Sequence, residues 1–340
     1  MAQINKPNEY FNTKLYTGNG STQSITGVNF QPDWVWIKDR NLSYNHALFD
    51  AVRGTTKLLQ SNTTNAEQTT SGVSSFDSDG FTLGSDIGMN QSSGSFASWN
   101  WLAGGTASSN TDGSITSSVS ANTTNGFSIV TFTGTGANAT IGHGLNSVPS
   151  TIILKGYSNT PSWYVYHQAV GNQNYLNLNN SNATGTPDSA YWNSTTPTSS
   201  VFSIGVGGDV NGSGQTMVAY CFADVKGFSK MGSYVGNGNA DGTFIYTGFK
   251  PSWVMIKRSS GTQAWMMYDN KRSVFNTTND LLFANTSGAE SVDNSVGIDF
   301  LSNGFKCRSA DDGINSGSYI YMAFAENPLV GTNGVPATAR

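Results

Sequence analysis

The chain has 340 residues, of which only 11% are Asp, Glu, Lys or Arg, against roughly a quarter in an average globular protein. The net charge of -4 at pH 7 and the lack of any Lys/Arg run argue against nucleic-acid binding, which needs clustered positive charge. The N-terminal sequence has no apolar signal segment and no stretch approaches about 18 apolar residues, so we predict neither a cleaved leader nor membrane insertion.

Residues 1–12 precede the first repeating element and are predicted to form an N-terminal docking arm. Pro7 favours an extended path, and Tyr10 and Phe11 offer apolar side chains to a partner. Because the arm is short and no coiled-coil shaft follows it, the sequence favours a compact knob or decoration over a long fibre.

A sequence block that begins at residue 30 occurs three times. FQPDWVWIKDRNLSYNHALFD at 30–50 resembles VPSTIILKGYSNTPSWYVYH at 148–167 and FKPSWVMIKRSSGTQAWMMYD at 249–269, with Lys38, Lys155 and Lys257 at the same position. The chain is therefore three copies of a unit of about 100 residues, a size that can form its own core. We predict a first repeat at 13–105, a Ser/Thr-rich linker at 106–122, a second repeat at 123–227, and a third repeat with a C-terminal tail at 228–340.

Within each block, a short apolar run between proline and lysine predicts a buried strand, and a second run after a loop of about seven residues completes a hairpin. Gly, Asn and Asp turns separate further strand candidates, and no window has helical periodicity. The fold class predicted is all-β, with three tandem antiparallel β-sandwich domains of the jelly-roll or concanavalin-like kind. The linker lacks apolar alternation and is expected to be flexible or extended.

The sequence offers few candidates for catalysis. The histidines His46, His143 and His167 lie in no catalytic motif. Cys221 and Cys307 occupy non-equivalent positions, so free cysteines are favoured over a disulfide. No catalytic residue and no cofactor are predicted.

Carboxylate pairs such as Asp77/Asp79 and Asp311/Asp312 occur where turns are expected. A pair of this kind could serve a glycosidase or bind calcium through its oxygens. The interpretation we favour is that each Asp bonds the backbone of its own turn, which leaves Asp77 and Asp79 as weak calcium candidates.

One loop position carries a ring in every repeat, namely His46, Trp163 and Trp265. If exposed, such a flat face beside Asn and Ser could stack on a sugar, so these residues are the candidate glycan-binding site. The alternative is that they begin the return strand and pack under the loop.

The order YTGNGSTQSITG, FQPDWVWIKDR, SFDSDGFTLGSD, SWNWLAGG, GFKPSWVMIKR and AFAENPLVGTNGVPATAR resembles a repeat family of tailed-bacteriophage virion proteins. Such proteins are common in phages of marine and other aquatic bacteria, and are described as tail-fibre, lectin-like or structural. The resemblance implies jelly-roll or concanavalin-like lobes on the particle exterior, and it carries over no catalytic residue.

The leading hypothesis is a non-enzymatic virion protein: a tail fibre, spike or knob component that contacts the host surface or its glycans. The alternatives are a capsid decoration (head fibre) protein and a glycan depolymerase. The expected partners are other virion proteins (capsid, portal, tail or fibre base), a host surface glycan, and further copies of the chain in a homo-oligomer. The expected location is the virion, after assembly in the host cytoplasm and release by lysis.

Overall fold

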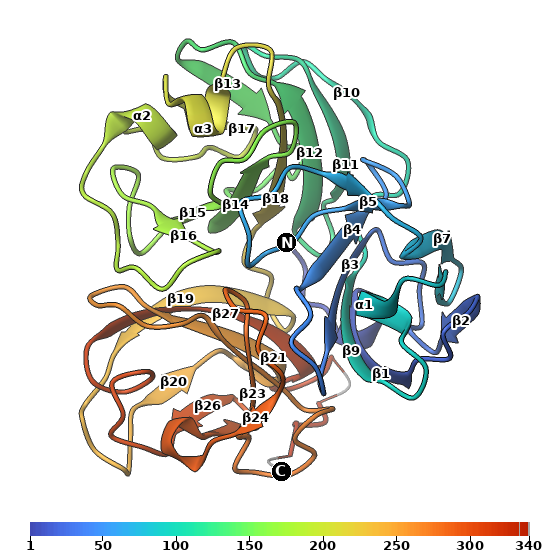
Figure 1. The fold of residues 1–340 in the computed structure, drawn as a ribbon. Helices are drawn as coiled ribbons and strands as arrows, with labels where there is room; N and C mark the ends of the chain where they lie inside the picture. Colours follow the sequence, from blue (N-terminus) through green and yellow to red (C-terminus); the bar gives the residue numbers. More distant parts are fainter. Residues whose placement is uncertain (333, 339–340) are drawn as a thin grey trace.

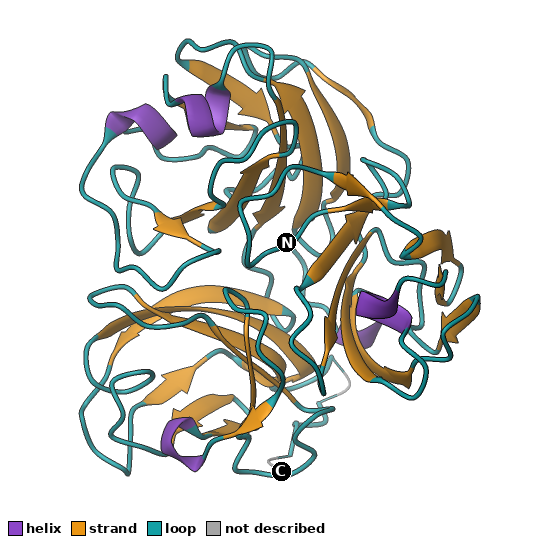
Figure 2. Cartoon of the chain, viewed as in Figure 1, coloured by secondary structure: helices purple, strands orange, loops and turns teal. Residues whose placement is uncertain are grey.

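The computed structural model describes residues 1–332 and 334–338; the predicted end of the third repeat at residue 340 lies outside them. Strands and loops make up nearly all of this part, and its helical segments have three or four residues each (Figure 2). Within the same part, no helix has the length and apolar character needed to cross a membrane. The prediction of an all-β chain with antiparallel sheets is confirmed.

The first repeat forms a larger and a smaller sheet, both antiparallel. In order across the sheet, the larger one consists of β1 (Phe11–Thr17), β9 (Ser95–Trp101), β3 (Trp34–Asp39) and β4 (Ala47–Asp50). The smaller one consists of β2 (Gln23–Thr26), β8 (Gly80–Leu83) and β7 (Val73–Asp77). Short accessory elements are η1 (Pro7–Glu9), β5 (Lys57–Leu58), β6 (Gln68–Thr69) and α1 (Ile87–Asn90).

The second repeat repeats this order and adds strands at both edges. Its larger sheet is β10 (Ser108–Asn110), β11 (Ser117–Asn122), β12 (Phe127–Thr133), β18 (Thr216–Phe222), β14 (Thr151–Gly156), β15 (Tyr164–His167) and β16 (Leu176–Asn177). Its smaller sheet is β13 (Ala139–Gly142) and β17 (Val201–Ile204), and its helical turns are α2 (Ser189–Trp192) and α3 (Gly208–Asn211). The predicted flexible linker at 106–122 is wrong, because β10 and β11 lie within it and extend the sheet through β12.

The third repeat has the same arrangement. Its larger sheet is β19 (Ser229–Val235), β27 (Ser318–Pro328), β21 (Phe249–Arg258), β22 (Met266–Asp269), β23 (Asp280–Phe283) and β24 (Ser291–Val292). Its smaller sheet is β20 (Phe244–Tyr246), β26 (Gly304–Cys307) and β25 (Ile298–Leu301), preceded by η2 (Asn294–Val296). Figure 1 shows the three repeats arranged around a common centre.

The strands at the centre are buried on both faces, which explains their continuous apolar runs. Side chains alternate between faces along a strand, so Trp34 and Trp36 of β3 point to one cluster while Val35 and Ile37 point to another. The first cluster, here called the shared core, also contains Ile153 of β14 and both Trp253 and Met255 of β21. Each repeat therefore has a core of its own, but the second faces of the three larger sheets pack together.

Candidate functional site

The three ring side chains predicted to bind glycan lie inside the molecule. His46 and Trp163 are 0% exposed and Trp265 is 2% exposed. In each case a ring nitrogen meets a backbone carbonyl of another repeat. The contacts are Trp163 Nε1 to Gln60 O at 2.9 Å, Trp265 Nε1 to Asn177 O at 2.9 Å, and His46 Nε2 to Phe283 O at 3.0 Å.

The glycan-binding prediction for these residues is therefore wrong, because a buried ring has no free face to stack on a sugar. The alternative, packing beneath the loop, is what the structure shows. In addition, the contacts run in a circle, from second repeat to first, third to second and first to third. His46 can make the same kind of contact as the two tryptophans. The Trp36 indole donates to His46 Nδ1 at 2.8 Å, so the ring proton lies on Nε2, which donates to the Phe283 carbonyl.

The three repeat-equivalent lysines, Lys38, Lys155 and Lys257, are also buried, each at 0% exposure. Lys155 Nζ donates to Pro161 O at 2.6 Å in its own repeat and to Thr64 O at 2.9 Å in the first repeat. Burial lowers the pKa of Lys155 to about 7 and the pKa values of Lys38 and Lys257 to about 8. These lysines hold loop carbonyls together and are not open to solvent.

The other two lysines also donate to backbone carbonyls. Lys257 Nζ donates to Arg258 O at 2.6 Å, and to Ser181 O of the second repeat at 3.2 Å. Lys38 Nζ donates to Asp39 O at 2.6 Å and to Leu42 O at 3.1 Å. Two of the three lysines thus bind the preceding repeat directly.

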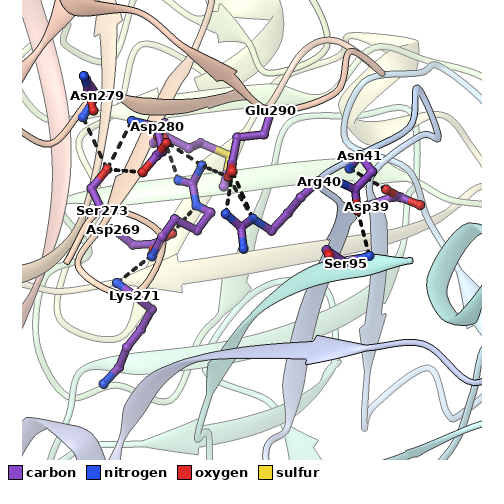
Figure 3. Close-up of polar contacts among 12 residues, drawn as sticks. Asp39, Arg40, Asn41, Ser95, Asp269, Lys271, Ser273, Asn279, Asp280 and Glu290 are labelled. Atoms are coloured by element: carbon purple, nitrogen blue, oxygen red, sulfur yellow. Dashed lines mark hydrogen bonds and ion pairs between the residues drawn. The ribbon is translucent and has the colours of Figure 1, made fainter. Parts of the chain in front are cut away.

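An ion-pair network with a buried centre at Asp269 and Arg272 joins the first and third repeats. Asp269 accepts from Arg272 Nε at 2.6 Å and from the Trp99 indole of the first repeat at 3.1 Å. Glu290 accepts from Arg272 at 3.1 Å and from Arg40 of the first repeat at 2.6 Å. Figure 3 shows Glu290 reaching toward Arg40, with Asp269 on the other side of the network. Burial acts to raise the pKa of Asp269, but Arg272 and the other donors hold that pKa below its usual value.

The first and second repeats meet through the equivalent network. Asp50 accepts from Arg53 Nε at 2.6 Å and from the Tyr220 hydroxyl of the second repeat at 2.7 Å, while Arg53 also pairs with Glu67 at 3.0 Å. The Arg53 guanidinium lies 6.0 Å from the ring centroid of Tyr157, again in the second repeat. Both networks are closed, with the charged groups paired with one another.

The third interface, between the second and third repeats, has no such ion pair at these positions. His167 stands where the other repeats have Asp50 and Asp269, and it is buried, which lowers its pKa to about 4. Val170 stands at the arginine position and Thr184 at the glutamate position. A neutral set of side chains therefore replaces the charged one.

The predicted docking arm packs onto the chain itself. The Phe11 ring stacks on Phe324 with centroids 4.9 Å apart, and Tyr10 meets Phe228 edge-on at 5.9 Å. Pro7 is buried at the start of η1. The prediction that Pro7, Tyr10 and Phe11 dock onto a partner is wrong, because these side chains complete the contact between the first and third repeats.

The start of the chain also meets the end of the third repeat. Ile4 N–H also donates to Lys226 O, at the end of the second repeat, at 3.1 Å. The Gln3 amide donates to Val330 O at 2.7 Å, and Thr332 N–H donates to Asn5 Oδ1 at 3.2 Å. Residues more than 320 positions apart in sequence thus close the circle of repeats.

The two calcium candidates accept hydrogen bonds from other groups of the first repeat. Asp79 accepts from the backbone N–H groups of Gly27 and Asn29 at 2.9 and 2.7 Å, and these bonds lower its pKa. Asp77 accepts from the Ser75 and Thr82 hydroxyls at 2.8 and 2.7 Å. Among the described residues, no group of three or more His, Cys, Asp or Glu side chains could hold a metal ion. Neither set of bonds is the predicted one to the backbone of the residue's own turn, since Asp79 binds a segment about 50 positions earlier and Asp77 binds side chains.

Two surface clefts lie at interfaces between repeats. One of about 430 Å³ between the first and third repeats has a mostly polar lining that includes Asn12, Asn29 and Glu326. Another of about 510 Å³, at the junction of the first and second repeats, includes Gln31 and Asp33. Each lining contains a single carboxyl group, whereas glycoside hydrolysis uses two.

Sequence reasoning missed the arginine and glutamate members of the two networks. The signal was an Asp-x-x-Arg spacing at Asp50/Arg53 and Asp269/Arg272, with a glutamate closing the following Leu/Asn/Ser segment in both repeats. A charged pair that recurs at the same positions of a chain so poor in charge indicates an internal contact.

A family model described as "Domain of unknown function (DUF7483)" matches residues 6–328. No curated protein and no solved structure matches the chain. The match spans all three repeats, so the unit that this family describes is the whole circle of repeats and not one copy of the repeat.

Proposed function

Because this chain belongs to the family defined by that domain of unknown function, DUF7483, we propose a function for the three-repeat body as a whole. The proposal is a non-enzymatic structural protein on the exterior of a tailed-phage particle, as a tail fibre, spike or knob component that contacts the host surface. Each repeat would act as one lobe of a three-lobed knob, with its larger and smaller sheets forming a sandwich of the jelly-roll or concanavalin-like kind.

The observation that carries the proposal is where the chain places its charged groups. The side chains of Arg53 and Arg272 are buried, and the carboxylates that pair with them also bind a side chain of the neighbouring repeat. Separating or removing one partner of such a pair is strongly destabilising, because the other charge would then lie uncompensated in the interior. This supports a rigid body that keeps its shape outside the cell.

The second support is that the lining of each interface cleft contains one carboxyl group and not the two that glycoside hydrolysis uses. Glu326 in the polar cleft is bonded to Asn270 at 2.9 Å and lies 3.5 Å from Lys250. Asp33 in the other cleft accepts from the backbone N–H groups of Ala103 and Gly105. Both carboxylates hold local structure, which favours a binding or structural role over a depolymerase.

The proposal is tested on intact particles of a phage that encodes the chain. Antibodies raised against the recombinant protein, bound to gold and viewed by electron microscopy, should label the tail tip or fibres. The recombinant chain should also reduce adsorption of particles to host cells in a concentration-dependent way. Labelling of the head surface would instead assign the capsid decoration role, and absence from purified particles would overturn the proposal.

A depolymerase is tested separately. Purified chain is incubated with host capsule or exopolysaccharide, and reducing ends are measured over time. The proposal expects no increase over buffer, whereas release of oligosaccharide that stops with Glu326→Gln would identify an enzyme. Asp241→Asn, in an exposed ion pair with Lys306, is the matched control.

A further inference from the structure

In the second repeat, a segment of the chain covers the free edge of the smaller sheet. Residues 113–117 run beside β13, and Ile115 forms a parallel bridge with Ile141. The Ile115 N–H donates to Thr140 O at 3.1 Å. Thr140 N–H in turn donates to Ser114 Oγ at 2.9 Å. The edge strand of this repeat is thus already occupied by an added extended segment.

The fit of this segment depends on small residues and one apolar anchor. A Cβ added to Gly113 would lie 2.3 Å from Thr140 O, so the close approach requires glycine. Ser117 Oγ donates to Gly142 O at 2.8 Å. The partly buried Ile115 side chain packs against the core of the second repeat.

The equivalent strand of the third repeat is β20. Ile141 opposes Phe202 in the second repeat, and Ile245 opposes Phe305 in the third. Both isoleucines are buried in the core of their own repeat. By this register Phe244 corresponds to Thr140 and Tyr246 corresponds to Gly142.

The backbone of β20 presents the same free bonding groups as β13. On the inner side, Thr243 O accepts from Cys307 N–H at 3.0 Å and Thr247 N–H donates to Asn303 O at 3.0 Å. Because inner and outer bonding alternates along an antiparallel strand, the N–H and C=O groups of Phe244 and Tyr246 point away from β26. Among the described residues, β26 is the strand that pairs with β20, which leaves β20 at the edge of its sheet.

The side chains of β20 also differ from those at the equivalent edge of the first repeat. Phe244 is 43% exposed and Tyr246 is 55% exposed, where β2 carries the polar residues Ser24 and Thr26. Exposed edge strands are usually protected by Lys, Pro or a covering segment. An aromatic edge strand without such protection is suited to pairing with a further strand.

We propose that β20 is a docking site for an extended segment of another polypeptide, which adds to the edge of the smaller sheet as residues 113–117 add to β13. The segment would carry small residues such as Gly and Ser next to the β20 backbone and a β-branched apolar residue in the place of Ile115. Phe244 and Tyr246 would pack against its side chains. This inference does not depend on the particle role, since it rests on the comparison between two repeats of one chain.

The test uses the full chain and a synthetic peptide with the sequence of residues 111–119, TDGSITSSV. Asn110 is left out because its Oδ1 would lie 1.7 Å from a Cβ at the Gly142 position, which Tyr246 takes in β20. Amide hydrogen exchange is measured by NMR with and without the peptide. In the free chain, Phe244 and Tyr246 should exchange quickly while Thr140 is protected, and saturating peptide should slow Phe244 by about tenfold or more. Protection of Phe244 before peptide is added, or no slowing at millimolar peptide, would overturn the proposal.

Variants locate the bound peptide. Phe244→Pro removes the outward N–H and should weaken peptide binding about tenfold, a loss near 1.4 kcal/mol. Ser24→Pro, at the equivalent position of β2, is the matched control and should leave binding unchanged. Both variants are checked for folding by thermal unfolding.

If Phe244→Pro does not fold, the double variant Phe244→Ser/Tyr246→Thr places the first repeat's residues on β20. This variant should retain its fold and lose several-fold in peptide affinity. Unchanged affinity would overturn the proposal. Glycan binding that the same double variant abolishes, without peptide binding, would assign the face to carbohydrate and also overturn it.

Discussion

Trp163→Ala should destabilise the whole molecule rather than remove a binding activity. The indole is fully buried in the shared core, which contains side chains from all three repeats. Replacing a buried tryptophan with alanine costs about 3–5 kcal/mol. The Gln60 carbonyl also loses its donor, which adds about 1 kcal/mol. The sum of about 4–6 kcal/mol is a large part of the 5–15 kcal/mol that typically stabilises a folded protein.

The assay is equilibrium urea unfolding, followed by amide exchange resolved along the chain. Because the shared core joins the repeats, we expect one transition at a lower urea midpoint and faster exchange in all three larger sheets. Trp163→Phe is the matched control, since it keeps most of the volume but loses the bond to Gln60, and it should cost only about 1–2 kcal/mol. Loss of protection confined to the second repeat, with β3 and β21 unchanged, would show that the repeats fold independently and would refute the reasoning.

Three further predictions concern charge. Asp269→Asn removes one of the two carboxylates that pair with the buried Arg272 and leaves Glu290 at 3.1 Å, so it should lower stability by about 3 kcal/mol in urea unfolding. Lys6→Ala in an exposed pair should leave the urea midpoint unchanged, and equal midpoints for the two variants would contradict the buried-network account. Burial lowers the folded-state pKa of Lys155 to about 7 from an ordinary 10.5. Between these two pH values the unfolded chain binds more protons than the folded chain, so the free energy of unfolding should rise from pH 7 to pH 10. Lys155→Met should reduce that rise, and an identical slope would exclude this lysine as its source. Because backbone N–H groups already bond Asp79, millimolar calcium should leave the Tm unchanged, and a clear upward shift would restore the calcium assignment.

The strands of the repeated block could be predicted because local apolar runs and turns determine them. Trp34 to Ile37 and Trp253 to Ile256 were expected as strands and lie in β3 and β21. What covers their second faces could not be predicted, because that depends on how distant repeats meet. The apolar residues on both faces of β3 were the available sign of double burial.

The errors at the ring residues and at the linker have related causes. Trp163 follows a loop rich in polar residues, and nothing local shows that a neighbouring repeat covers it. The segment 106–122 has the Ser/Thr composition of a linker, yet β11 needs few apolar residues because Val119 and the partly buried Ala121 are its contribution to the core of the second repeat. The arm was misjudged for the same reason, since its apolar side chains bind residues such as Phe324, more than 300 positions later.

Because Gln3 contacts Val330, the first and third repeats are neighbours in space although they lie at opposite ends of the chain. A gene rearranged so that the third repeat is joined to residue 1 through a short linker, with new ends opened near Gly105, would encode the same ring. In such a circular permutant both chain ends would lie at the junction of the first and second repeats. A reporter or anchor fused to either end would then be attached to a different side of the protein.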